Sequence, residues 1–217
     1  MVLASARWVV FNGTMATQRF VVHMSRALAG LVISQANSSR SLEAANRREL
    51  LDRATNARER KNIRIDIALR RPAEWPTEDH LMGAALRARL AAPDLSREWE
   101  PLTDKERVAL SLPGMWPGSE RPGEDLSSPC AFTVDYDLLW QARLAAWRIS
   151  EPWINRILAE GLGYLPWLTE AQRARRAELG TNVLTSGAIA RQALQHYLPG
   201  KTTAGSSKLN SAESKHK

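Results

Sequence analysis

The pattern of apolar and polar residues along the chain predicts a mostly α protein. Over residues 43–61, good helix formers place apolar side chains on one side, and Arg and Glu at helical spacing on the other. Three later helix starts follow the rules for N-caps: Thr77 precedes an acidic first turn, and capping boxes begin at Thr103 and at Thr169. We therefore expect five or six short amphipathic helices, Pro/Gly-rich loops and no sheet.

For two segments the sequence is compatible with more than one structure. Ile alternates with other residues over 62–70, which is typical of a strand, but no second strand is evident to pair with it. We interpret this segment as a continuing helix or as an extended arm docked on a partner. Residues 135–161 predict one amphipathic helix or a bent helix pair, in which Pro152 lies in the first turn of the second helix. A last helix is expected over about 186–197, ending at Pro199.

Composition limits the class of protein. The chain has 217 residues, enough to bury a core, and a single cysteine, Cys130. One cysteine excludes a disulfide scaffold, and also a Cys-based zinc site or an iron–sulfur cluster held by this chain alone. The sequence contains no run of 18 apolar residues, which argues against an ordinary transmembrane helix.

The net charge of +7 comes from the two ends of the chain. Residues 1–42 contribute +4 and residues 200–217 contribute +3, whereas residues 43–199 hold 22 cations and 22 carboxylates. A basic total is typical of nucleic-acid binders, but the balanced middle weakens that interpretation.

The first 40 residues have the composition of a mitochondrial targeting segment, because they carry Arg, Ser, Thr and Ala but no acid. A secretory signal is the alternative, although its apolar run at 27–33 begins far from the start of the chain. A disordered basic start, or initiation at Met15 or Met24, is a third. The tail at 200–217 has one large aliphatic residue and is expected to be disordered.

These observations divide the chain into five segments. We expect a targeting segment (1–40), an Arg-rich helix or extended arm (41–71), a Trp-containing helical segment (72–122), a C-terminal helical region (123–199) and a disordered basic tail (200–217).

The Trp-containing segment carries a motif. Residues 99–107 have the form Trp-x-x-Leu-Thr-x-x-Glu-Arg, and a Gly/Pro loop with a Trp and an Arg-Pro pair follows. Together with the upstream Glu-Trp and its capped helix, the order and spacing over about 72–122 resemble the matrix-side segment of the cytochrome c oxidase subunit IV family. The resemblance implies an accessory subunit whose interaction residues would be Trp75, Trp99, Leu102, Glu106, Arg107, Trp116 and Arg121. The transmembrane helix that follows in that family is missing, because residues 123–161 are interrupted by Asp, Glu and Arg. The same motif also resembles the last helix of HMG boxes, whose basic first helix is missing.

A catalytic set is not evident. The four histidines have no His or Cys partner at metal-ligand spacing, and Cys130 has the surroundings of a small buried residue. Neither a dinucleotide fingerprint nor a phosphate-binding Gly-Lys-Ser/Thr loop is present. We therefore expect no catalytic residue, no metal, no cofactor and no direct small-molecule substrate.

Eight Trp residues in an Arg-rich chain favour an interaction protein, because both side chains are enriched at protein interfaces. Our first hypothesis is that the protein is a non-catalytic structural subunit of a mitochondrial respiratory complex, with cytochrome c oxidase as the first choice. It would lie on the matrix side or be associated with the inner membrane. Its partners would be other subunits of that assembly. The alternative is an RNA-binding protein of the mitochondrial ribosome, contacting rRNA phosphates through residues 47–71 and the Lys-bearing tail. A soluble, transiently bound assembly factor is a third hypothesis.

Overall fold

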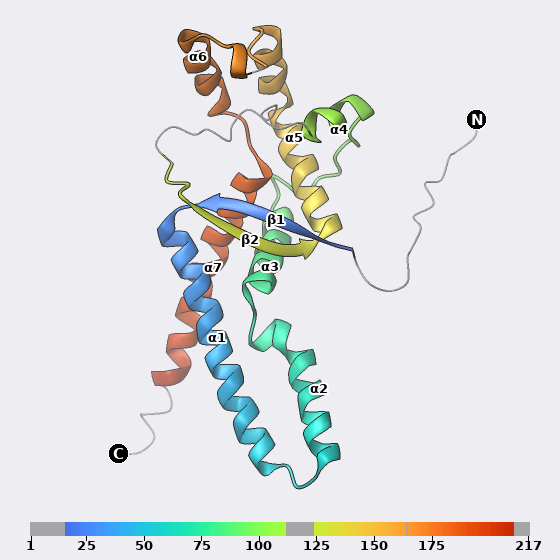
Figure 1. Cartoon of the computed structure of the whole chain (residues 1–217), viewed down its shortest axis with the longest axis vertical. Helices are drawn as coiled ribbons and strands as arrows, with labels where there is room; N and C mark the ends of the chain where they lie inside the picture. Colours follow the sequence, from blue (N-terminus) through green and yellow to red (C-terminus); the bar gives the residue numbers. More distant parts are fainter. Residues whose placement is uncertain (1–15, 112–123, 164, 211–217) are drawn as a thin grey trace, which may run out of the picture.

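The structure is a computed structural model that describes residues 16–111, 124–163 and 165–210 (Figure 1). The described residues form seven α-helices, one 3-10 turn and a two-stranded sheet, so the prediction of a mostly α fold is confirmed. In chain order the elements are β1 (Thr17–Met24), α1 (Arg26–Arg53), α2 (Ala57–Glu74), α3 (Glu78–Leu90), α4 (Asp104–Ser111), β2 (Ser128–Asp135), α5 (Tyr136–Ala159), η1 (Leu165–Trp167), α6 (Glu170–Gly180) and α7 (Ser186–Asn210).

The sheet is a feature that the sequence analysis did not predict. Strands β1 and β2 pair antiparallel, with Phe20 opposite Phe132. Each strand alternates a buried and an exposed side chain, and Val22, Met24 and Val134 lie on the buried face with the two phenylalanines. The expectation of no sheet was wrong because the partners lie more than 100 residues apart, and neither strand alone indicates a pair.

Residues 17–40 belong to the fold. Strand β1 and the first half of α1 occupy them, and Leu28, Val32 and Ala36 of α1 are buried. Removal of residues 1–40, the predicted targeting segment, would therefore remove a core strand, and the boundary at residue 40 stays a prediction. Residues 1–15 lie outside the described part of the chain.

The main core lies between the sheet and helices α1, α3, α5 and α7. Helices α3 and α7 form the most extensive helix pair, and both present small and apolar side chains to it, such as Met82, Leu86 and Leu194. Helix α3 begins as predicted: the Thr77 hydroxyl accepts from the backbone N–H of His80, whose ring nitrogen accepts in return from the Thr77 N–H.

A second core lies around the C-terminal half of α5. Helix α5 is continuous to Ala159 with Pro152 inside it, so the alternative of a bent pair starting at Pro152 was wrong. Ser150, within α5, is fully buried. Its hydroxyl donates a hydrogen bond to the carbonyl of Leu184 and accepts one from the N–H of Leu184. Two residues after the end of α5 lies Gly161, whose φ of 69° is the left-handed conformation that favours glycine. Helix α6 begins with the predicted capping box at Thr169.

A helical hairpin projects from this body. The C-terminal half of α1 runs beside α2, which includes residues 62–70, and the continuing-helix interpretation of that segment is confirmed (Figure 1). We call residues 40–74 the arm. Ile67 is buried in the arm, and the salt bridge between Arg71 and Glu43 joins its two helices at 2.5 Å. Trp75 is buried at the base, with the Arg70 guanidinium 5.4 Å from its ring centroid.

Helix α7 runs to Asn210, past the expected end at Pro199. The tail that we expect to be disordered, residues 200–217, overlaps the end of this helix, and residues 211–217 lie outside the described part. Within the described ranges, none of the helices combines the length and the apolar character that a bilayer span requires.

Candidate functional site

An apolar groove lies between the segment that precedes α4 and the N-terminal half of α5. Its volume is about 990 Å³, the size of a pocket that takes a peptide segment or a large ligand. One wall is formed by residues 95–102 with Leu90 and Arg107, and the other by α5. The lining residues are Leu90, Leu95, Ser96, Arg97, Glu98, Trp99, Pro101, Leu102, Arg107, Asp137, Trp140, Gln141 and Leu144.

Trp99 dominates the first wall. The indole is half-buried and packs against the main core, and its Nε1–H donates to the carbonyl of Leu95 over 3.3 Å. The guanidinium of Arg97 lies 3.8 Å from the ring centroid, which is cation–π distance. Both contacts fix the indole, so it enters a complex with little loss of side-chain freedom.

Trp140 dominates the second wall. It is half-buried, packs against the second core and stacks on Tyr136, with ring centroids 6.4 Å apart and planes 8° from parallel. Tyr136 is 44% exposed, so the stack continues to the surface. Leu144, one turn further along α5, extends the same apolar wall.

A charged cluster behind the groove joins its two walls. Glu106, in the first turn of α4, accepts from Arg148 Nη1 over 2.8 Å and from Trp147 Nε1 over 3.1 Å, both from α5. The same carboxylate accepts from the Thr103 N–H over 2.6 Å, which completes the predicted capping box. Arg148 also donates to the carbonyls of Glu100 and Pro101. We call Glu106, Arg148, Trp147 and Thr103 the clasp.

The clasp shifts the pKa of Glu106. Burial raises the pKa, but the hydrogen bonds from Thr103, Arg148 and Trp147 together outweigh it and lower the pKa from 4.5 to about 2. Glu106 is therefore ionised at neutral pH, and its charge holds the segment before α4 on α5.

The rim of the groove is charged. Arg97 and Arg107 lie on one side, and neither forms a salt bridge within the described part of the chain; Arg107 donates through Nε to the carbonyl of Leu102. Glu98 and Asp137 also line the rim. An apolar floor with charges of both signs around it is typical of a site for an amphipathic protein segment.

The predicted interaction residues are partly brought together here. Trp99, Leu102 and Arg107 line the groove, and Glu106 lies behind it in the clasp. Trp75 lies apart from them, buried at the base of the arm. Trp116 and Arg121 lie outside the described residues.

The sequence analysis missed Trp140. A signal for it was present, because Tyr136, Trp140 and Leu144 follow at intervals of four on one side of a helix. Their contact with residues 95–102 depends on the fold, which the pattern alone does not give.

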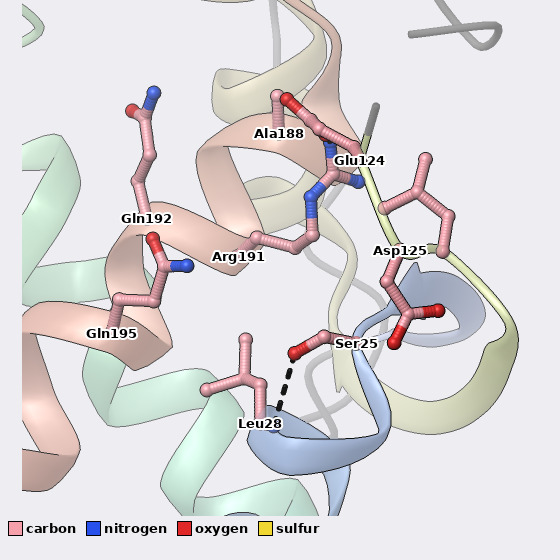
Figure 2. A pocket seen from close by; sticks show the side chains of 9 residues that line it. Ser25, Leu28, Glu124, Asp125, Ala188, Arg191, Gln192 and Gln195 are labelled. Atoms are coloured by element: carbon pink, nitrogen blue, oxygen red, sulfur yellow. Dashed lines mark hydrogen bonds and ion pairs between the residues drawn. The ribbon is translucent and has the colours of Figure 1, made fainter. Parts of the chain in front are cut away.

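A second hollow of about 320 Å³ lies where the start of α1 meets α7 (Figure 2). Its polar groups bond mostly to each other: Arg191 donates to Glu124 over 2.9 Å and to the His23 carbonyl over 3.1 Å, and the Ser25 hydroxyl accepts from the Leu28 N–H. This arrangement caps α1 and ties it to α7, so we assign the hollow a structural role.

Potential metal-binding and nucleophilic side chains such as His80 and Cys130 have structural surroundings. Among the described residues, no three His, Cys, Asp or Glu side chains lie close enough to hold a metal ion. His80 caps α3, and burial raises the pKa of the Cys130 thiol, which disfavours the reactive thiolate.

Comparison with protein-family models, with curated proteins and with solved structures finds no match for this chain. The residues of the motif at 99–107 have structural roles in this fold. Leu102 fills the second core, Thr103 caps α4, and Glu106 forms the clasp.

Proposed function

We propose that the protein is a non-catalytic assembly subunit that holds a partner protein by an amphipathic segment in the groove. One observation carries the proposal: two fixed, half-buried indoles, Trp99 and Trp140, line a single groove whose rim includes Arg97 and Arg107. Trp and Arg are the residues that most often contribute strongly to binding at protein interfaces. The matching segment would place apolar side chains on the two indoles and a carboxylate beside the arginines.

A groove-filling variant tests this function. Ser96 is exposed and lines the groove, so Ser96→Trp occupies the space without removing a core contact. Gln195→Trp is the matched control, because Gln195 is also exposed but lines the second hollow. We expect the tagged wild type and the control to migrate on a native gel as a complex much larger than the 24.2 kDa chain, and Ser96→Trp to migrate as the free chain.

A photo-crosslinker at Gln141, on the α5 wall, identifies the bound segment. Crosslinks to one amphipathic segment of one partner support the proposal, and Arg97→Glu should then weaken the complex by removing a carboxylate contact. Migration of the wild type as a monomer, or equal complex formation by both Trp variants, would show that the groove does not dock a partner.

The resemblance of residues 72–122 to the subunit IV family makes a neighbouring subunit of a mitochondrial respiratory complex the first partner to test. Co-migration of the tagged chain with haem a absorbance would support cytochrome c oxidase. Location in mitochondria is part of the same proposal, and fractionation of cells that express the full chain tests this location. Recovery of the protein outside mitochondria would refute this choice of partner. The proposal that the groove binds a partner would still be tested by the native gel.

A further inference from the structure

The end of the arm carries positive charge that the chain does not neutralise. Residues 47–64 hold seven cations and three carboxylates, a net charge of +4. Residues 65–199, which form most of the body, hold fifteen cations and eighteen carboxylates. The even balance of residues 43–199 therefore conceals a basic arm end that is followed by a slightly acidic remainder.

Two of the three carboxylates in residues 47–64, Glu49 and Glu59, are engaged in local contacts. Glu59 accepts from the N–H and the hydroxyl of Thr55 at the start of α2, over 2.7 and 2.9 Å. Glu49 pairs with Arg53, and Asp66 pairs with Arg70. Asp52 is exposed and forms no salt bridge within the described part of the chain, and the net charge of +4 counts all three carboxylates.

Six exposed cations remain: Arg47, Arg48, Arg58, Arg60, Lys61 and Arg64. Within the described part of the chain, none of their side chains forms a hydrogen bond or a salt bridge. Arg47 does lie near Glu43, whose pKa it helps to lower after the main effect of the Arg71 hydrogen bond and salt bridge. A concentration of unpaired, solvent-exposed guanidinium groups is typical of a surface that binds phosphates.

The spacing suits a regular polyanion. In α2, Lys61 and Arg64 are three residues apart and Arg60 and Arg64 are four apart, so each pair consists of neighbours on the helix surface. Arg58 to Arg64 rises by about 9 Å along the helix axis. Over that length, each strand of a duplex presents about three phosphates.

The arm is also placed to reach a large partner. It extends away from the side of the body that carries α5 and α6 (Figure 1). Beyond Ser39 no residue of α1 is buried, and Ile67 alone is buried in α2. The arm therefore presents its cations without steric hindrance from the body.

We propose that the end of the arm binds the phosphodiester backbone of a nucleic acid. The six cations contact phosphates. The arm therefore recognises the charge and the spacing of the phosphates, and not the base sequence. An anionic membrane is the competing surface. Exposed apolar side chains on α2 are few, with Ile65 50% and Leu69 76% exposed, which is too little apolar area for stable insertion.

Salt-dependent binding of the full chain tests the proposal. Fluorescence anisotropy with labelled 24-base-pair duplex RNA and duplex DNA is measured from 50 to 200 mM KCl. With at least three phosphate contacts, the plot of log affinity against log salt has a slope of about −2.7 or steeper, so affinity falls about 40-fold over that range. Preference for RNA, or equal binding of both duplexes, supports the proposal and identifies the partner class.

Two triple variants with the same net charge supply the control. The arm variant carries Arg60→Gln, Lys61→Gln and Arg64→Gln; the body variant carries Arg19→Gln, Lys105→Gln and Arg173→Gln, which replaces exposed cations outside the arm. Gln keeps helix propensity, and circular dichroism confirms that both variants fold. We expect the arm variant to bind at least 20-fold more weakly at 100 mM KCl, with a slope shallower by about 2.7, and the body variant to change less than 3-fold.

Three results would overturn the proposal. One is a dissociation constant above 100 µM for both duplexes at 50 mM KCl. Another is an equal loss in the two variants, which would assign binding to net charge. The third is arm-dependent binding to vesicles containing phosphatidylglycerol without binding to either duplex, which would assign the arm to a membrane.

Discussion

Neutralising Glu106 tests whether the clasp holds the groove together. Glu106→Gln keeps the shape of the side chain but removes its charge, leaving Arg148, whose side chain is 12% exposed, with Glu151 as its remaining acidic partner. Removing one member of such a pair leaves a largely buried charge poorly compensated.

The magnitude follows from the pKa. A fall from 4.5 to about 2 corresponds to about 3 kcal/mol of preferential stabilisation of the ionised form in the folded state. The Glu106 side chain is 18% exposed, so water screens part of this interaction, and we expect a loss of about 2–3 kcal/mol in the free energy of unfolding at pH 7.

The pH dependence gives a second readout. Because the folded-state pKa of Glu106 lies below its ordinary value, the stabilisation is fully present above pH 4.5 and is lost as the pH falls toward 2. The difference between wild type and Glu106→Gln should therefore shrink across that window. Other carboxylates titrate there too, and taking the difference between the two proteins removes their common contribution.

Urea denaturation followed by tryptophan fluorescence and circular dichroism measures the effect. Glu98→Gln is the matched control, because Glu98 is exposed on the groove rim outside the clasp, and it should change stability by less than about 0.5 kcal/mol. A loss below about 0.5 kcal/mol for Glu106→Gln at pH 7, or a difference that stays constant down to pH 2.5, would refute the argument.

Three further changes test the fold. A chain that begins at Met15 should unfold cooperatively on heating, whereas one that begins at Ser41 lacks β1 and should not; cooperative unfolding of the shorter chain would contradict the core role of β1. Ser150→Ala leaves both backbone groups of Leu184 without their partner and should cost about 1–3 kcal/mol in urea denaturation, and a neutral effect would contradict that role. Gly161→Ala meets no atom within 4 Å, so its expected cost of about 1 kcal/mol comes from the left-handed backbone alone; equal or greater stability would refute this.

Helix starts were predictable because a cap is a local device. Thr77, Thr103 and Thr169 each bond to a backbone N–H three residues later, and that geometry depends on four consecutive residues. The end of α3 before Pro93 was predictable for the same reason.

Features that depend on distant contacts were not predictable in this way. The alternation in β1 was present in the sequence, but the acid-free composition around it favoured a targeting helix, and only pairing with β2 shows which face is buried. The groove likewise needs Trp99 and Trp140, which come from different elements and meet through the fold. The role of Glu106 as an interaction residue stays a prediction, and its bonds to Arg148 and Trp147 support the groove from behind.

The net charge of a long segment can hide a local excess of cations. Over residues 43–199 cations and carboxylates are equal in number, which weakened the interpretation of the chain as a nucleic-acid binder. The fold divides that stretch into an arm end of +4 and a remainder that is slightly acidic. The interleaved acids Glu49, Asp52 and Glu59 do not restore the balance locally, because seven cations outnumber them over residues 47–64. Since electrostatic attraction in salt acts over only about 10 Å, an anionic partner at the arm responds to the local +4 and not to the neutral sum.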